Sequence, residues 1–167
     1  MTTGAVIRPG RADDAAGVND VYNRFIRESV ATFEMEPYSE ADRRAWFARG
    51  AGDARYPVFV AENDGRICGF ANAAPFDPRE GYNSSVKTSV FISPDRQGER
   101  LGARLYEALF AALAGTGLHR AYALIVAPNP ASAALHRRFG FAHVATLSEV
   151  GRKFGRYHDV MWFEKRL

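Results

Sequence analysis

Residues 85–113 read SVKTSVFISPDRQGERLGARLYEALFAAL and decide the fold, because they join a strand, a short turn and a long helix. Apolar and polar residues alternate over 86–92, which predicts a strand with two different faces. A leucine recurs at every fourth position from Leu101 to Leu113, which predicts a helix with one apolar face. The loop over 93–98 ends in a glycine. A glycine turn that opens a long helix presents unpaired backbone N–H groups, so this joint is a candidate anion site.

The turn reads QGERLG over residues 97–102, and alone it does not identify a ligand, because any joint of this kind needs glycine. Arg96, Arg100 and Arg104 are spaced four apart around it, and a guanidinium pairs well with a phosphate. The other arginines are scattered singly or in pairs, without the basic run that is typical of a nucleic-acid-binding arm. We therefore predict a small phosphate-bearing ligand and no nucleic-acid partner.

The rest of the chain surrounds this unit with further strands and helices. The predicted order is strand, two helices, three strands, helix, strand, helix and two strands, with a basic loop over 151–155 before the last strand. No repeat or linker divides the sequence, so we expect a single domain over 1–167. The first predicted strand ends at residue 9, and the other strands cover 56–62, 66–74, 86–92, 121–126, 143–150 and 157–164. The predicted helices begin near Asp13, Ser39, Leu101 and Asn129.

The composition is that of an ordinary soluble domain, since 47% of the 167 residues are hydrophobic and 25% are charged. No apolar stretch approaches the ~20 residues that cross a bilayer, and the first residues do not resemble a secretory signal, so we expect a cytoplasmic protein without a membrane partner. The single cysteine, Cys68, is expected to be a buried strand residue. Only three of the 22 basic residues are lysines, Lys87, Lys153 and Lys165, so a lysine in a candidate site is informative.

Short motifs over nearly the whole chain are shared with one known family. They are Tyr22-Asn23, Ala31-Thr32-Phe33-Glu34, Trp46-Phe47, Tyr56-Pro57-Val58, Ser89-Val90-Phe91-Ile92, Gln97-Gly98, Asn129, Leu135-His136, Gly140-Phe141 and the run from Lys153 to Val160. In these motifs the chain resembles the GNAT acetyltransferases. Within that superfamily it most resembles the branch of phosphinothricin and methionine-sulfoximine N-acetyltransferases. The resemblance implies an α/β (α+β) fold whose mixed, mostly antiparallel sheet of about seven strands is splayed between strands four and five and flanked by about four helices.

The resemblance implies an enzyme that moves the acetyl group of acetyl-CoA to the primary amine of a small amino-acid-like substrate. Acetyl-CoA would be a cosubstrate, no metal would be needed, and the protein would be a homodimer. The residues that match cofactor contacts in the family are Phe91, Ile92, Ser93, Gln97, Gly98, Glu99, Arg100, Leu101, Gly102, Ala103, Asn129 and Ser132. Those that match or adjoin its substrate contacts are Phe33, Arg79, Tyr82, Lys87 and Ser89.

Three positions depart from patterns that are common in these families. Arg100 stands where the phosphate loop has a glycine, so its side chain would either crowd the backbone approach or point outward and add a phosphate contact. We favour the second, because a residue other than glycine is expected to occupy a helix start without strain. Lys87 stands where many members of the branch have a glutamate base. His136 stands where many GNAT enzymes have a tyrosine acid, as it does within the branch.

The lysine in place of glutamate leaves the proton acceptor open. An alkylammonium with a pKa of about 10.4 must lose a proton before it attacks a thioester, and a protonated Lys87 cannot take it unless burial lowers its own pKa. His136, with an ordinary pKa of about 6.5, is favoured as the catalytic acceptor, directly or through water. Glu34 and Glu28 are weaker catalytic candidates. Without the resemblance, His136 reads as a solvated helix residue.

Lys87 has two further interpretations. It is either an exposed sheet lysine or a group that attracts a substrate carboxylate, and the latter would suit a more acidic substrate. A second function class also follows from this residue: a protein that binds acetyl-CoA without efficient transfer and acts as a sensor or an interaction module. His119, His143 and His158 lack metal-ligand spacing, so no metal site is predicted.

Overall fold

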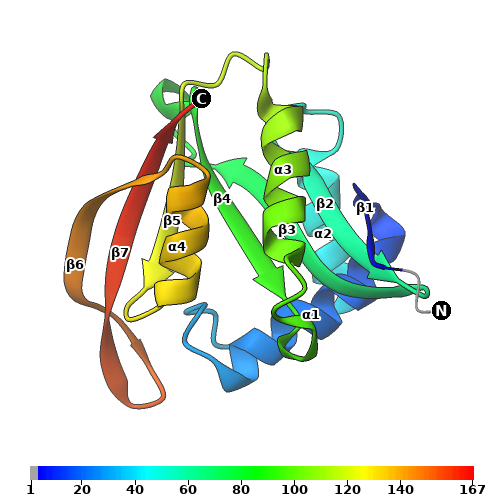
Figure 1. The fold of residues 1–167 in the computed structure, drawn as a ribbon, viewed down its shortest axis with the longest axis horizontal. Coiled ribbons are helices and arrows are strands. Elements are labelled where there is room, and N and C mark those ends of the chain that lie inside the picture. Colours follow the sequence, from blue (N-terminus) through cyan, green and yellow to red (C-terminus); the bar gives the residue numbers. More distant parts are fainter. Residues whose placement is uncertain (1–3) are drawn as a thin grey trace.

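The computed structural model describes residues 4–167 and contains one seven-stranded sheet with the strand order β1-β2-β3-β4-β5-β7-β6 (Figure 1). The strands are β1 (Val6–Pro9), β2 (Val58–Asn63), β3 (Arg66–Pro75), β4 (Ser85–Ile92), β5 (Arg120–Val126), β6 (Ala142–Lys153) and β7 (Arg156–Arg166). The α-helices are α1 (Ala15–Glu28), α2 (Glu40–Gly50), α3 (Leu101–Leu113) and α4 (Pro130–Arg138). Short 3-10 turns cover Ala12–Asp14, Glu80–Tyr82 and Pro94–Arg96. The predicted order of elements is confirmed.

The sheet is mixed, and its one parallel junction is short. β4 pairs with β5 only over three residues, from Ser85 opposite Arg120 to Lys87 opposite Tyr122. On its other side β4 stays paired with β3 from Val86 to Ile92. The strands β4 and β5 therefore separate beyond Lys87, and Figure 1 shows the sheet opening there. This confirms the splay that was expected between strands four and five.

The helices cover the two faces of the sheet and set up two apolar clusters. α3 and α4 lie on one face, which we call the α3 face, and α1 and α2 lie on the other, the α1 face (Figure 1). Leu105 and Leu109 of α3 are fully buried against the sheet, as their spacing predicts. On the α1 face, the ring of Phe91 from β4 contacts the rings of Tyr22 and Phe25 at centroid distances of 4.9 Å and 5.2 Å.

Local signals place most element boundaries. Ser39 caps α2, because its side chain accepts a hydrogen bond from the Asp42 N–H while the Asp42 carboxylate accepts one from the Ser39 N–H. Asn129 caps α4 in the same way, accepting a hydrogen bond from the Ser132 N–H at 3.0 Å. Cys68 is buried, as expected, and its Sγ donates to the Ala61 carbonyl.

The expected loop over 151–155 is mostly strand. Gly151 and Lys153 belong to β6 and pair with His158 and Arg156 of β7. Only two residues make the turn, Phe154 with φ +51° and Gly155 with φ +74°. Two successive residues with positive φ form a turn whose twist matches that of the flanking strands, so the hairpin continues almost to its tip.

No helix within residues 4–167 is long and apolar enough to cross a bilayer. In the same range, no group of three or more histidine, cysteine, aspartate or glutamate side chains is arranged to hold a metal ion.

Candidate active site

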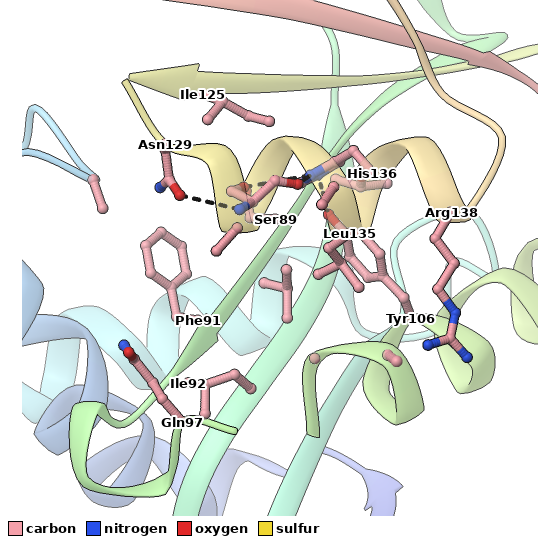
Figure 2. A pocket seen from close by; sticks show the side chains of 18 of the residues that line it. Ser89, Phe91, Ile92, Gln97, Tyr106, Ile125, Asn129, Leu135, His136 and Arg138 are labelled. Carbon is pink, nitrogen blue, oxygen red and sulfur yellow. Dashed lines mark hydrogen bonds between the residues drawn. The ribbon is translucent and has the colours of Figure 1, made fainter. Parts of the chain in front are cut away.

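A cavity of about 710 Å³ lies where β4 and β5 separate. β4, the start of α3, the end of β5 and α4 all contribute to its wall, and Figure 2 shows Ser89 and Phe91 on β4 facing Asn129 and His136 across it. The sequence-predicted residues that line it are Ser89, Phe91, Ile92, Gln97, Gly98, Arg100, Gly102, Ala103, Asn129, Ser132 and His136. Residues from four separate segments of the chain are thus brought to one site.

Three of the predicted cofactor residues do not line this cavity. The Ser93 hydroxyl donates to the Asp95 carboxylate at 2.5 Å, and Glu99 accepts two hydrogen bonds from the Arg96 guanidinium at 2.6 Å and 2.8 Å. Leu101 is buried in the core beneath α3. Their side chains are therefore engaged elsewhere.

The start of α3 carries the features of an anion site. Arg100 occupies the N-cap position and its side chain caps none of the first-turn N–H groups. Gly98 just before it has φ +88°, a conformation that favours glycine. The uncapped N–H groups of the first turn and the positive end of the helix dipole therefore lie at the part of the cavity wall that Gly98, Arg100 and Gly102 form.

The expectation that Arg100 would sit without strain is wrong, because its φ is +59° and its ψ is 17°. This left-handed conformation suits glycine and is unfavourable for a residue with a Cβ. Of the three arginines around the turn, Arg104 is turned away and donates to the Ala5 carbonyl, and Arg96 is paired with Glu99. Arg100 lines the cavity, and its side chain forms no hydrogen bond or ion pair within residues 4–167.

Replacing Arg100 by glycine should therefore stabilise the fold by about 0.5–1 kcal/mol, because the left-handed conformation costs glycine least. Urea denaturation of the wild type, Arg100→Gly and Arg100→Ala measures the effect. Arg100→Ala removes the same charge but keeps the strained backbone, so it serves as the matched control and should show no gain. Equal stability of the two variants would contradict strain at this position.

His136 is buried in the wall of the cavity, 4% exposed, and both of its ring nitrogens have partners. Nδ1 lies 2.7 Å from the Ser132 carbonyl oxygen, and Nε2 lies 2.9 Å from the Tyr106 hydroxyl. A carbonyl only accepts, so Nδ1 carries the proton in the neutral ring. Nε2 then accepts a hydrogen bond from the Tyr106 hydroxyl, and the two side chains form a connected pair.

Burial sets the protonation state of this pair. Burial lowers the pKa of His136 below its ordinary 6.5, although the Ser132 carbonyl works in the opposite direction. Burial also raises the pKa of Tyr106, so the phenol keeps its proton. At neutral pH the pair is therefore a neutral imidazole and a neutral phenol, ready to accept one proton.

Tyr106 was not among the predicted site residues, although it lines the cavity and is fully buried. Its position in the sequence carried a signal, because it lies between Leu105 and Leu109 on the apolar face of the predicted helix. A hydroxyl on such a face needs a buried partner. The partner, His136, is 30 residues away and belongs to another helix.

The loop between α1 and α2 is fastened to the β6–β7 hairpin. The Lys153 ammonium donates to the Ser29 and Thr32 carbonyl oxygens, both at 2.7 Å, and the side chain is 2% exposed. Next to it, the ring of Phe33 lies directly over Gly151, so that an added Cβ would come within 2.2 Å of the ring. This contact sets the position of the predicted residues Phe33 and Glu34, which lie outside the cavity lining.

The remaining predicted catalytic and substrate residues do not line the cavity. Glu34 is exposed and accepts a hydrogen bond from the Tyr38 hydroxyl at 2.9 Å. Arg79 is paired with Asp77 through two hydrogen bonds of 2.7 Å and 3.1 Å, and its guanidinium lies 5.0 Å from the centre of the Tyr82 ring. Lys87 is half-buried on β4, two residues before Ser89 and on the same strand face.

The model of the Acetyltransferase (GNAT) family matches residues 18–141. The chain is 45% identical to a phosphinothricin N-acetyltransferase of Streptomyces coelicolor, over 96% of this chain and 95% of that protein. It is 35% identical to an L-methionine sulfoximine/L-methionine sulfone acetyltransferase of Pseudomonas aeruginosa, over 98% of this chain and 95% of the other.

Solved structures show the same likeness in three dimensions. A GNAT superfamily phosphinothricin acetyltransferase from Sinorhizobium meliloti, solved in complex with AcCoA, is 31% identical and superposes with a TM-score of 0.92, over 99% of this chain and 89% of that chain. An acetyltransferase from Salmonella typhimurium, solved with its cofactor acetyl-CoA, is 30% identical with a TM-score of 0.94, over 99% and 95%.

Proposed function

The chain belongs to the acetyltransferase (GNAT) family, and on that premise we propose that it transfers the acetyl group of acetyl-CoA to the primary amine of a small amino-acid-like molecule. The substrates would be of the phosphinothricin or methionine sulfone/sulfoximine type, after the names of the relatives. The observation that carries the proposal is the cavity itself, which has uncapped helix N–H groups at one end and the His136–Tyr106 pair in its wall.

The residues of the cavity fit acetyl-CoA. Within residues 4–167 no strand pairs with the β5-facing edge of β4 beyond Lys87, so its backbone groups from Thr88 to Ile92 are available to an extended amide chain. The first-turn N–H groups of α3 suit a pyrophosphate, and Arg100 adds a cation beside them. The bound thioester would supply an acetyl carbon that is activated toward amines.

The reaction needs one proton to leave the substrate ammonium before its nitrogen forms a bond to the acetyl carbon and the C–S bond breaks. We propose that the Tyr106 oxygen takes this proton, directly or through water, while the phenol proton passes to His136 Nε2. The products of this transfer are a phenol and an imidazolium, so the charge balances. As the C–S bond breaks, the nitrogen loses its second proton, which goes to the departing thiolate directly or through water. The imidazolium releases the first proton through Tyr106 to solvent, so one amide, one thiol and one proton are formed. Glu34 and Lys87 take no part in this proton path.

A thiol-release assay with acetyl-CoA tests the proposal. Phosphinothricin, methionine sulfone and methionine sulfoximine are the expected acceptors, with simple polyamines and aromatic amino acids as contrasts. Turnover of an amino-acid-like acceptor supports the enzyme. Binding of acetyl-CoA by calorimetry with no turnover of any acceptor would instead establish the second candidate, an acetyl-CoA-binding sensor or interaction module.

We also propose a homodimer, since the edge strand β6 and its partner β7 leave apolar side chains exposed. Leu147 and Val150 of β6 and Tyr157 of β7 are all more than two-fifths exposed, at 41%, 56% and 62%. Long apolar edge strands are usually covered in native proteins. Sedimentation of the full chain should give twice the mass of 18.5 kDa, and a monomer at micromolar concentration would contradict the dimer.

A further inference from the structure

Among the described residues, the Lys87 ammonium on the α1 face of the sheet has no salt-bridge partner. It is half-buried and forms no hydrogen bond or ion pair within the described part of the chain. It is also on the last rung of the β4–β5 pairing, opposite Tyr122, so it lies at the apex of the splay. Ser89, two residues or about 7 Å further along β4, lines the cavity. An amino-acid substrate bound in the cavity beside Ser89 would therefore be long enough to reach Lys87.

Two carboxylates near Lys87 are paired with arginines. Asp77 is bound by the Arg79 guanidinium, which together with the nearby Lys87 charge holds the pKa of Asp77 down at about 2. Glu164, next to Tyr122 across β5 and β7, lies 3.9 Å from Arg120. Neither carboxylate forms a salt bridge with Lys87.

Aromatic rings lower the polarity around Lys87. The ring of Tyr122, its partner across the β4–β5 junction, lies 4.9 Å from that of Phe76 and 6.4 Å from that of Trp162. An anion that enters such a surrounding is attracted more strongly than it would be in open water, because less solvent screens the charges. The corner formed by Lys87, Phe76, Tyr122 and Trp162 is suited to a second negative charge on the substrate.

We propose that Lys87 selects acceptor amino acids whose side chain ends in an anionic group, such as a phosphinate, sulfonate or carboxylate, over neutral side chains of the same shape. The inference rests on the proposed function of the cavity and names the substrate class of that site. The amine would lie at the cavity beside Ser89, and the anionic end of the side chain would reach along β4 to the ammonium. Positioning and attraction are the only roles assigned to Lys87.

Homocysteate and methionine sulfone test this selection, because they share a backbone and a sulfur with two oxygens and differ in one oxygen anion against one methyl group. The wild type should show a kcat/KM at least tenfold higher for homocysteate. In Lys87→Met the ratio of the two kcat/KM values should fall toward one, and in Lys87→Glu it should invert. Lys165→Met, the same substitution on the other face of the sheet, should leave the ratio as in the wild type.

Other outcomes overturn the proposal. A wild type that does not distinguish the two acceptors would show that the ammonium does not face the side chain. An equal loss for both acceptors in Lys87→Met would mean that Lys87 pairs with the α-carboxylate, which both contain. If no acceptor is turned over, the proposed function fails, and calorimetric binding of the two amino acids to the acetyl-CoA-loaded protein still decides the selection by the same ratio.

Discussion

His136→Ala should lower kcat by about 100-fold or more while the KM for acetyl-CoA changes little, because it removes the acceptor of the proton that leaves the amine. The contact that carries this expectation is the 2.9 Å hydrogen bond from Tyr106 to Nε2. Steady-state kinetics with saturating acetyl-CoA would measure it. Tyr106→Phe should lower kcat by a similar factor, because it breaks the path to the imidazole and keeps the ring.

His143→Ala is the matched control, since His143 is exposed on β6, where its ring lies 2.9 Å from the Thr146 hydroxyl and 5.3 Å from the Phe163 ring. It should keep the wild-type rate. His136→Asn guards against a folding defect in the alanine variant, because an amide can keep one hydrogen bond in the buried site. A full rate in either well-folded His136 variant, or in Tyr106→Phe, would remove the pair from the mechanism.

The pH dependence of the rate should follow the lowered pKa of His136. Because burial favours the neutral ring, the imidazole stays able to accept a proton at pH values where an exposed histidine would already be charged. The acid limb of kcat/KM that His136 causes should therefore lie below pH 6.5. The same shift lowers stability as the pH falls through 6.5, since the unfolded chain binds the proton first.

Local patterns in the sequence predicted much of this architecture. The four-residue leucine repeat of α3 and the caps of α2 and α4 act between neighbours in the chain, so they can be read without knowing the fold. The helices α2 and α4 begin where they were expected, at Ser39 and Asn129, and both residues cap their helices. The positions of Gln97, Gly98 and His136 in the cavity followed from the resemblance to the family and from the strand–turn–helix joint.

The parts that were missed depend on contacts across the fold. The left-handed conformation of Arg100 was hidden, because the residue type disfavours it and only the surrounding turn imposes it. Tyr106 meets His136 from another helix, and Lys153 reaches carbonyl groups more than 120 residues earlier in the chain. A sequence pattern reports neither kind of contact. The sequence pattern placed Lys153 in a basic loop, and a buried ammonium is not expected in such a loop.

Lys153→Met should lower the free energy of unfolding by about 2–3 kcal/mol, because it leaves two carbonyl oxygens without their charged donor. Both bonds are short, and the Ser29 and Thr32 carbonyls have no substitute donor of equal charge in the loop. Burying the ammonium is itself unfavourable, and this burial lowers the pKa of Lys153. The methionine variant avoids that unfavourable burial, which offsets part of the lost stability. Chemical denaturation at pH 7 would measure the difference.

The same change should loosen the loop between α1 and α2, which carries Phe33. Two contacts hold this loop to the β6–β7 hairpin: the hydrogen bonds of Lys153 and the packing of Phe33 on Gly151. Amide exchange at residues 29–34 should therefore rise in Lys153→Met, and the KM for the amine should rise more than kcat falls, because Phe33 matches a substrate contact of the family. Lys165→Met is the control: its ammonium lies 5.6 Å from the Phe110 ring, so the same substitution there should cost well under 1 kcal/mol. If the two methionine variants were equally stable and exchanged alike, Lys153 would be a tolerated buried cation and the loop would depend on Phe33 alone.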